Sequence, residues 1–197
     1  MKQDNVTQLH SKDARASLRW FSEEELDIAR PSEQLRPWLQ ERGLLTARVQ
    51  QHCRSSFRLQ VLKPDDEGAG WLRRFDDWAP DINGSEVREI VMWCDDVPGL
   101  YAETIIPPAT AAAQPWLQTL GTQPLGERLQ MMQGVTRSSF SFAALPAGPA
   151  LPSAWLSSAS SPLWARRSSF RFASADSGTE QNELWLIEVF LAATAGS

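Results

Sequence analysis

The chain has 197 residues with 42% hydrophobic content and a formal net charge of −5, which suits one well-filled domain rather than two. Its 19 lysines and arginines are scattered rather than clustered, and this excludes the basic footprint of a nucleic-acid-binding protein. No apolar run is long enough to span a bilayer, and the first residues lack the apolar segment of a secretory signal. We therefore expect a cytoplasmic protein without membrane insertion.

The chain offers few side chains for metal or redox chemistry. Its two cysteines, Cys53 and Cys94, each lie inside an expected structured segment, which favours reduced thiols over a disulfide. Its two histidines, His10 and His52, are far apart and have no spacing typical of a zinc or haem site. We expect no metal and no cofactor.

The first third of the chain predicts a tail, two helices and a strand. Residues 1–31 are polar, and we expect them to form a flexible extension before a single domain over residues 32–197. Apolar residues then recur at helical spacing on both sides of Gly43, and two short helices joined in this way suit a lid. Residues 54–62 alternate as a strand does, and a loop rich in Pro, Gly and Asp follows.

Residues 86–110 predict a β-hairpin, because two β-branched and aromatic runs are joined by an Asp-Asp-Val-Pro-Gly turn. Successive side chains of a strand point to opposite faces, so Arg88 shares a row with the apolar Ile90 and Met92. A guanidinium cannot shed its proton and is costly to bury unpaired. Arg88 therefore either reaches solvent at the sheet end or meets an anion inside.

The segment after the hairpin predicts two helices, the first ended by Gly121 and the second begun near Pro124. The amides of Leu125 and Gly126 would lie in the first turn, where they have no intrahelical partner and favour an anion. Strands are expected at 135–142, 166–173 and 183–191, with a flexible surface insertion at 143–162. Without long crossover helices between them, the strands imply an α+β fold with a mainly antiparallel sheet.

The last strand places one acid, Glu188, in a row with Leu184, Leu186 and Phe190. An apolar setting raises the pKa of a carboxyl group, and buried acids of this kind are frequent in active sites. With Arg88, Glu188 leaves two interpretations open. The two charges either form an internal ion pair, or they mark the cationic end and the carboxylate end of a pocket.

From about Pro37 to Ala192 the chain resembles the chorismate pyruvate-lyase family, whose members make 4-hydroxybenzoate for ubiquinone. The matching segments stand in the family's order and at similar spacing. They are Leu44-Leu45-Thr46-Ala47-Arg48, Val87-Arg88-Glu89-Ile90, Thr104-Ile105-Ile106-Pro107, Leu120-Gly121-Thr122-Gln123-Pro124-Leu125-Gly126, Leu163-Trp164-Ala165-Arg166-Arg167-Ser168 and Glu188-Val189-Phe190-Leu191.

The resemblance implies a mainly antiparallel sheet with flanking helices and a lid-covered internal ligand site. It implies that Arg88 and the Leu125 amide, next to Gly126, hold the ring carboxylate of chorismate. Glu188 would bond the ring hydroxyl and handle a proton, and Leu45 would cover the ligand. The expected activity is that of a carbon–oxygen lyase, independent of metal and cofactor, which converts chorismate to 4-hydroxybenzoate and pyruvate as a monomer.

One position departs from the family pattern. Where an arginine precedes Thr-Val-Val-Pro in the family, this chain has Glu103. If that arginine receives the enolpyruvyl carboxylate, another cation such as Arg48 or Arg166 must do so here. Two rival hypotheses therefore stay open: a non-catalytic sensor of aromatic acids with the same fold, and an inactive relative of the lyases. Turnover of chorismate separates the lyase from both.

Overall fold

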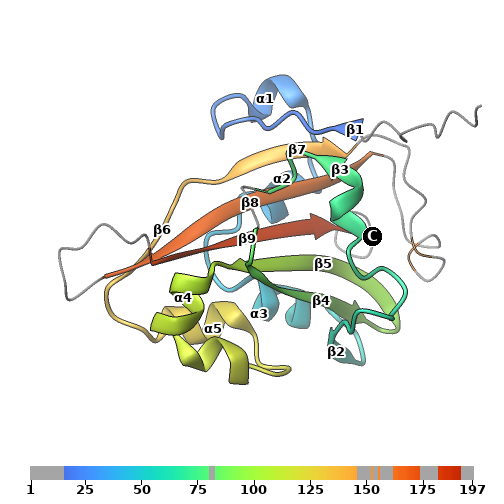
Figure 1. Ribbon diagram of the computed structural model, residues 1–197. Coiled ribbons are helices and arrows are strands. Elements are labelled where there is room, and N and C mark those ends of the chain that lie inside the picture. The colour runs from blue at the N-terminus through green and yellow to red at the C-terminus, as the bar shows by residue number, and fades with distance from the viewer. Residues whose placement is uncertain are drawn as a thin grey trace, which may run out of the picture.

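The computed structural model describes residues 16–79, 83–145, 152, 155, 162–173 and 182–191. Its centre is a seven-stranded sheet in the order β2-β4-β5-β9-β8-β6, with β7 also paired to β8 (Figure 1). All pairings within this sheet are antiparallel, which confirms the expected α+β class. The strands are β2 (Phe57–Val61), β4 (Glu86–Cys94), β5 (Val97–Ile106), β6 (Val135–Arg137), β7 (Ser141–Leu145), β8 (Leu163–Phe172) and β9 (Glu183–Phe190).

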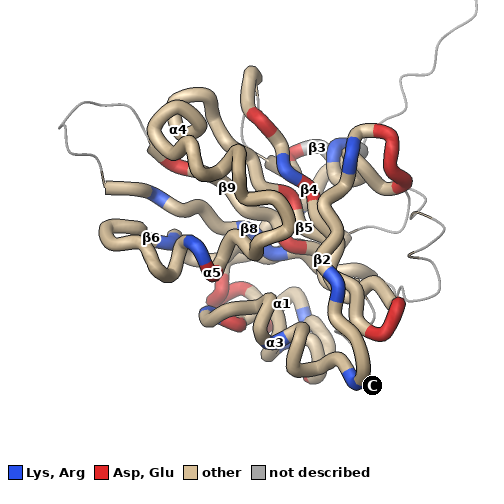
Figure 2. The backbone as a smooth tube through the Cα atoms, turned by 90° about the horizontal axis from the view of Figure 1, so that it is seen from below, with Lys and Arg blue, Asp and Glu red and all other residues tan. Residues whose placement is uncertain are grey.

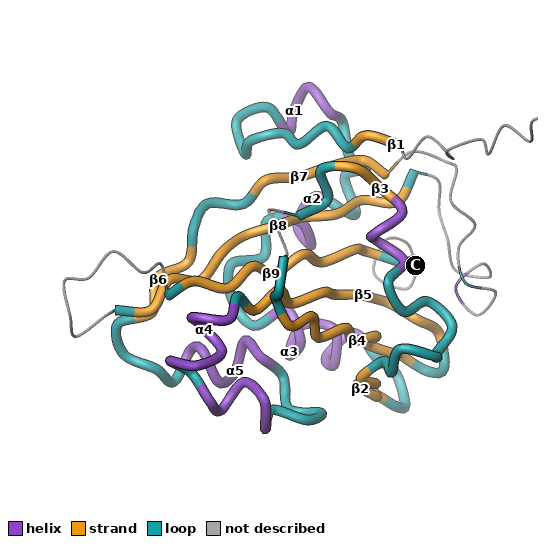
Figure 3. The backbone as a smooth tube through the Cα atoms, in the orientation of Figure 1, coloured by secondary structure: helices purple, strands orange, loops and turns teal. Residues whose placement is uncertain are grey.

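Short helices flank this sheet (Figure 3). The predicted pair around Gly43 is present, and the predicted helical stretches after the hairpin are also found. Gly121, between these stretches, has φ +53°, a conformation that glycine adopts without strain. The helical elements are α1 (Leu26–Ala29), α2 (Arg36–Leu39), α3 (Leu45–His52), η1 (Trp71–Arg74), α4 (Pro108–Ala113), η2 (Pro115–Thr119) and α5 (Leu125–Gln130).

Strand register decides which charged side chains share a face. Residues directly opposite each other in a sheet point to the same side. Arg88 lies opposite Thr104, and Ala102 lies opposite Glu188, so Arg88 and Glu188 belong to one face. Glu103 is adjacent to both Ala102 and Thr104 in β5 and therefore points to the other face.

The face that carries Arg88 and Glu188 is covered by helices at both ends. At one end α2 and α3 pack on the sheet, and Leu39 and Leu45 join the same apolar cluster as Ile90. At the other end η2 and α5 form a second cluster, in which Leu125 packs with Phe170. The charged residues lie between the two apolar clusters.

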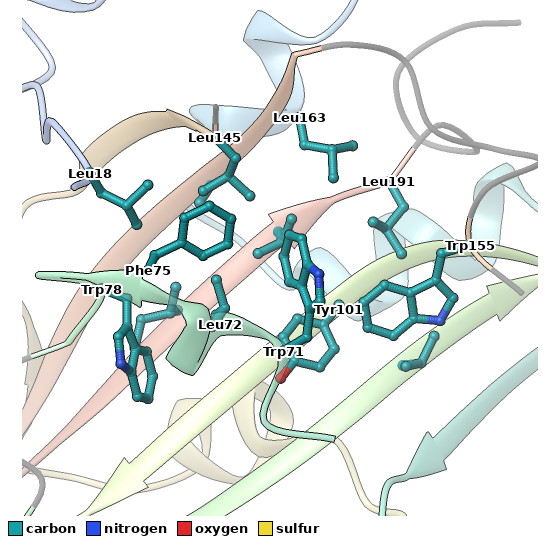
Figure 4. Packing of buried hydrophobic residues seen from close by; sticks show 14 of the residues in the cluster. Leu18, Trp71, Leu72, Phe75, Trp78, Tyr101, Leu145, Trp155, Leu163 and Leu191 are labelled. Atoms are coloured by element: carbon teal, nitrogen blue, oxygen red, sulfur yellow. The ribbon is translucent and has the colours of Figure 1, made fainter. Parts of the chain in front are cut away.

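The opposite face holds an aromatic cluster, which Figure 4 shows from close by. Trp71 packs edge-on against Phe75, Tyr101 and Trp155, and all four rings are buried. Burial of a large aromatic side chain contributes roughly 2–3 kcal/mol each. This cluster makes the second face of the sheet a packed core.

The expected flexible extension does not reach to residue 31. Residues 1–15 lie outside the described residues, but β1 (Ala16–Ser17) pairs with β3 (Phe75–Asp76), and Leu18 and Leu26 are buried. The indole of Trp20 donates a hydrogen bond to the Asp77 carbonyl at 2.8 Å. These few apolar residues are widely spaced in a polar segment, so periodicity does not reveal their burial.

The expected insertion at 143–162 is also shorter at its start. Strand β7 continues to Leu145, where Ala143 and Leu145 are buried, and Trp155 belongs to the aromatic cluster. Alanine-rich composition suggested a surface loop, but small side chains fit where β7 lies against the core. Most of the remaining insertion lies outside the described residues.

The two cysteines form a disulfide, so the prediction of reduced thiols is wrong. Cys53 directly follows α3, and Cys94 ends β4. The carboxylate of Asp95 accepts hydrogen bonds from the amides of Arg54, Ser55 and Ser56, each at 2.8 Å. These contacts hold the chain after Cys53 beside the end of β4, and a one-dimensional pattern does not show that closeness.

The described charges are dispersed over the molecule rather than gathered in one basic surface (Figure 2). Among the described helices, none is long and apolar enough to cross a membrane.

Candidate active site

A cavity lies on the helix-covered face, between the start of α3, the start of α5 and the sheet. The five residues predicted from the sequence all line it: Leu45, Arg88, Leu125, Gly126 and Glu188. Leu45 is the first residue of α3 and Leu125 the first of α5, and both side chains are buried. The structure therefore brings all five predicted site residues to one place.

Arg88 is held by backbone carbonyl groups rather than by an acid. Its Nη2 donates to the Gly121 carbonyl at 2.8 Å and to the Gln123 carbonyl at 3.2 Å. Within the described parts of the chain, no carboxylate forms an ion pair with it. Burial lowers the pKa of Arg88 to about 10, so the group is still cationic at neutral pH. The cavity thus has an oriented cation without a protein counter-charge.

Glu188 pairs with two other arginines instead of Arg88. Its Oε2 accepts from Arg166 Nε at 2.6 Å and lies 3.3 Å from Arg137 Nη2. Burial opposes ionisation, but the two guanidinium groups outweigh it and hold the pKa of Glu188 below its usual value. The expected raised pKa is therefore wrong, and Glu188 is a carboxylate at neutral pH.

The positions of the two side chains decide whether Arg88 and Glu188 form an ion pair with each other. The described residues contain no Arg88–Glu188 ion pair, and both side chains line the cavity. Arg166 faces Glu188 directly across the β8–β9 pairing, which explains why it becomes the partner. Sequence patterns place each charge in an apolar row but do not reveal which strands will be neighbours.

Arg137 is a charged residue of the cavity lining that the sequence patterns did not single out. Its Nε donates to Ser168 Oγ at 3.0 Å, and its guanidinium stacks on the rings of Phe140 and Phe170. Burial lowers the pKa of Arg137 to about 10, so it also stays charged. The sequence does place Arg137 in an expected strand, but β6 is only three residues long and its apolar row is too short to be distinctive.

The charged residues that line the cavity are three arginines and one glutamate, a net charge of +2: Arg88, Arg137, Arg166 and Glu188. Arg48, which was considered as a further cation, does not line the cavity. It pairs with Glu41 at 2.8 Å and stacks on Trp38. Within the described residues, no cluster of His, Cys, Asp and Glu could hold a metal ion.

The side chain of Glu103 does not reach this cavity, because it lies on the opposite face of the sheet. Its carboxylate contacts the hydroxyl of Tyr101 beneath the aromatic cluster, and its exposed fraction is 0%. Glu103 therefore adds no negative charge to the cavity. Substitution of Glu103 by arginine would bury a positive charge beside the aromatic cluster.

A helix-covered antiparallel sheet with a cavity of net charge +2 has an architecture and a charge that suit a small anionic ligand. Its apolar walls suit a ring, and Arg88, which has no acidic partner among the described residues, suits a carboxylate. The family model for chorismate lyase matches residues 14–194. The chain therefore belongs to the chorismate lyase family.

Curated relatives support this membership. A probable chorismate pyruvate-lyase of Shewanella sp. (strain W3-18-1) is 31% identical over 195 residues, 96% of each chain. The probable chorismate pyruvate-lyase of Dechloromonas aromatica is 33% identical, over 81% of this chain and 87% of that protein. The protein of the same description from Ralstonia nicotianae is 40% identical, but the match spans about half of its length, 52%.

Proposed function

We propose that this protein eliminates pyruvate from chorismate to give 4-hydroxybenzoate, the aromatic precursor for ubiquinone. The observation that carries the proposal is the cationic cavity, in which Arg88 has no acidic partner among the described residues while Glu188 lies two strands away on the same face. Chorismate has two carboxylates, a ring hydroxyl and an apolar ring. Its charge of −2 complements the cavity's charge of +2.

Arg88 is proposed to bind the ring carboxylate. The carbonyl groups of Gly121 and Gln123 engage only Nη2, and the rest of the planar guanidinium is available for a carboxylate. The amides of Leu125 and Gly126, in the first turn of α5, would contact the same carboxylate. Leu45 would cover the ring from α3.

Glu188 is proposed to accept a hydrogen bond from the ring hydroxyl. Both arginines use Oε2, and no described donor contacts Oε1, which therefore has its acceptor capacity left. Because its pKa is held low, Glu188 is a weak base. Its main contribution is then to orient the hydroxyl group and the carbon that bears it.

The proposed reaction is an elimination that makes the ring aromatic. The bond between C3 and the ether oxygen breaks, and its electron pair leaves with the enolpyruvyl oxygen. A proton leaves C4, whose C–H electron pair forms the new ring double bond, and a proton added to the enolpyruvyl methylene carbon gives pyruvate. Aromatisation makes the reaction downhill, so we propose that no metal or cofactor takes part. The cavity arginines would stabilise the charge on the departing oxygen.

The test is conversion of chorismate by the purified protein in the presence of a chelator, followed through 4-hydroxybenzoate absorbance and coupled pyruvate detection. We expect turnover above the spontaneous rate. Arg88→Lys should lose at least about tenfold in kcat/KM, or roughly 1.4 kcal/mol, because an ammonium keeps the charge but not the planar fork. Arg58→Lys is the matched control, since Arg58 stacks on Trp93 at the sheet edge and does not line the cavity.

The outcome that contradicts the lyase is specific. Folded protein that binds 4-hydroxybenzoate but forms no product from chorismate would favour a sensor or an inactive relative. The cytoplasmic location and monomeric state expected from the sequence are proposals as well, and size-exclusion chromatography with light scattering checks the second.

A further inference from the structure

Arg166 has a donor that no described residue uses. Its side chain is fully buried, with Nε on Glu188 at 2.6 Å and Nη1 on the carbonyls of Leu39 and Glu41 at 3.1 and 2.6 Å. Its Nη2 has no hydrogen-bond partner among the described residues. A buried, charged N–H group without an acceptor is costly, and Arg166 lines the cavity. The unused donor indicates an acceptor that belongs to a ligand.

Arg137 lies beside this donor. Both guanidinium groups contact the same oxygen of Glu188, so they are close neighbours although they come from different strands. Their two positive charges share one carboxylate. The rings of Phe140 and Phe170 fix Arg137 on both sides, and Ser168 holds its Nε. The pair therefore has a surplus positive charge in a fixed position.

Arg88 lies on β4, and Arg166 lies on β8, with β5 and β9 between them. One carboxylate on Arg88 would leave the surplus charge around Arg137 and Arg166 without an anion. A ligand with a second carboxylate, on an arm that extends past Glu188, would neutralise it. The apolar residues Ala102 and Leu186 line the space between the two ends and provide no competing charge.

We propose that Arg137 and Arg166 form a second anion subsite that binds the second carboxylate of a cyclic dicarboxylate and so selects dicarboxylates over monocarboxylates. The inference rests on the proposed function, in which this group is the enolpyruvyl carboxylate that leaves with pyruvate. Loss of pyruvate empties the subsite, and the aromatic product then keeps the contacts proposed for its ring, its carboxylate and its hydroxyl but none with the Arg137–Arg166 pair.

The test compares two stable aromatic probes that differ by one carboxylate. They are 3-(carboxymethoxy)benzoate and 3-methoxybenzoate, whose affinities for the full chain are measured by titration calorimetry. Variants Arg137→Gln and Arg166→Lys are compared with Arg167→Gln. Arg167 is the matched control because it follows Arg166 in β8 but points to the other face, where it stacks on Trp20.

The wild-type protein and Arg167→Gln should bind the dicarboxylate at least about tenfold more tightly than the monocarboxylate. In Arg137→Gln the affinities for the dicarboxylate and the monocarboxylate should differ by less than about threefold. The affinity for the monocarboxylate itself should change little. Arg166→Lys should act in the same direction. Arg137→Gln decides the matter if Arg166→Lys does not fold, because Arg137 keeps some solvent contact, with 22% of its side chain exposed.

A purely structural role would lower the affinities of both probes equally and leave their ratio unchanged, which would overturn the proposal. A wild-type protein without preference for the dicarboxylate would overturn it too, because the two arginines would then contribute nothing to binding a second carboxylate. The same experiments distinguish failure of the subsite proposal from failure of the proposed function. Protein that selects the dicarboxylate but does not convert chorismate would support the subsite and reject the lyase.

Discussion

At the scale of single residues, the hydrogen bonds of the Tyr101 hydroxyl indicate the protonation state of the buried acid Glu103. The Tyr101 hydroxyl contacts Oε1 of Glu89, at 2.6 Å, and Oε1 of Glu103. A phenol has one proton to donate, so one carboxyl group must donate in return. Glu89 also accepts from the Gly70 amide at 2.5 Å and lies 3.8 Å from Arg73. Burial raises the pKa of the Glu103 carboxyl group, so Glu103 is assigned as the protonated partner.

This assignment predicts how stability depends on pH. Burial raises the pKa of Glu103 from its ordinary 4.5 to about 7. A carboxyl group whose folded pKa is raised stabilises the fold below its unfolded pKa, and this contribution is lost as the pH rises towards and through the folded value. Between pH 4.5 and 7 the free energy of unfolding should fall by about 3 kcal/mol from this residue. Urea unfolding at a series of pH values measures it.

Glu103→Gln should remove that fall, because an amide is neutral at every pH and can still bond to Tyr101. Glu86→Gln, an exposed change in the neighbouring strand, should keep the wild-type profile. If Glu103→Gln keeps it as well, the titrating group is a different one. The same geometry means that Glu103→Arg would place a cation beside Tyr101 rather than in the cavity.

Residue patterns identified the charges of the site but not their partners. Arg88 stands out because it is the one cation in the row that it shares with Ile90 and Met92, and Glu188 because it is the single charge in the row of its strand. Their partners depend on contacts across strands and loops, such as the Gly121 carbonyl for Arg88 and Arg166 for Glu188. The pKa of Glu188 was mispredicted for the same reason, since its cause is two arginines from other strands.

At the scale of elements, α3 is joined to the sheet through the disulfide between Cys53 and Cys94. The two cysteines are 41 residues apart, and closing a loop of that length restricts the unfolded chain. In the chain-entropy model this stabilises the fold by about 4 kcal/mol. The element that carries Leu45 into the cavity at its start is thus fixed at its other end.

We predict that the double change Cys53→Ser and Cys94→Ser lowers the free energy of unfolding by about 2–4 kcal/mol, measured by urea denaturation. Reduction of the wild-type protein with dithiothreitol should give a similar loss, whereas the double variant should not respond to the reductant. A wild-type midpoint unchanged after complete reduction would contradict a stabilising disulfide.

Elements with a strong period were predictable, and elements defined by tertiary contact were not. The β4–β5 hairpin and the pair of helices around Gly43 follow from local composition, and both are present. Strand β1 has two residues and exists only because β3 lies beside it. Segments of this kind have too few residues to show a period, so their structure comes from packing.

At the scale of the whole molecule, Glu188 joins parts that the chain order separates. Through Arg166 it is linked to the carbonyl groups at the end of α2, and through Arg137 it is linked to β6. The network bridges the two apolar clusters that pack under the helices. Because Arg166 is fully buried, it needs Glu188 as its counter-charge. The positions of α2 and β6 relative to the sheet therefore depend on Glu188.

We predict that Glu188→Gln lowers the free energy of unfolding by about 3–5 kcal/mol at pH 7, since it leaves two largely buried guanidinium groups without a carboxylate. Glu183→Gln is the control in the same strand. Its partner Arg171 is 3.6 Å away with 65% of its side chain exposed, so this change should cost less than about 1 kcal/mol. Urea unfolding of the two variants side by side measures the difference. Equal losses would mean that the Glu188 network contributes no more than a long ion pair with one exposed partner, and the coupling of α2 and β6 through Glu188 would have to be abandoned.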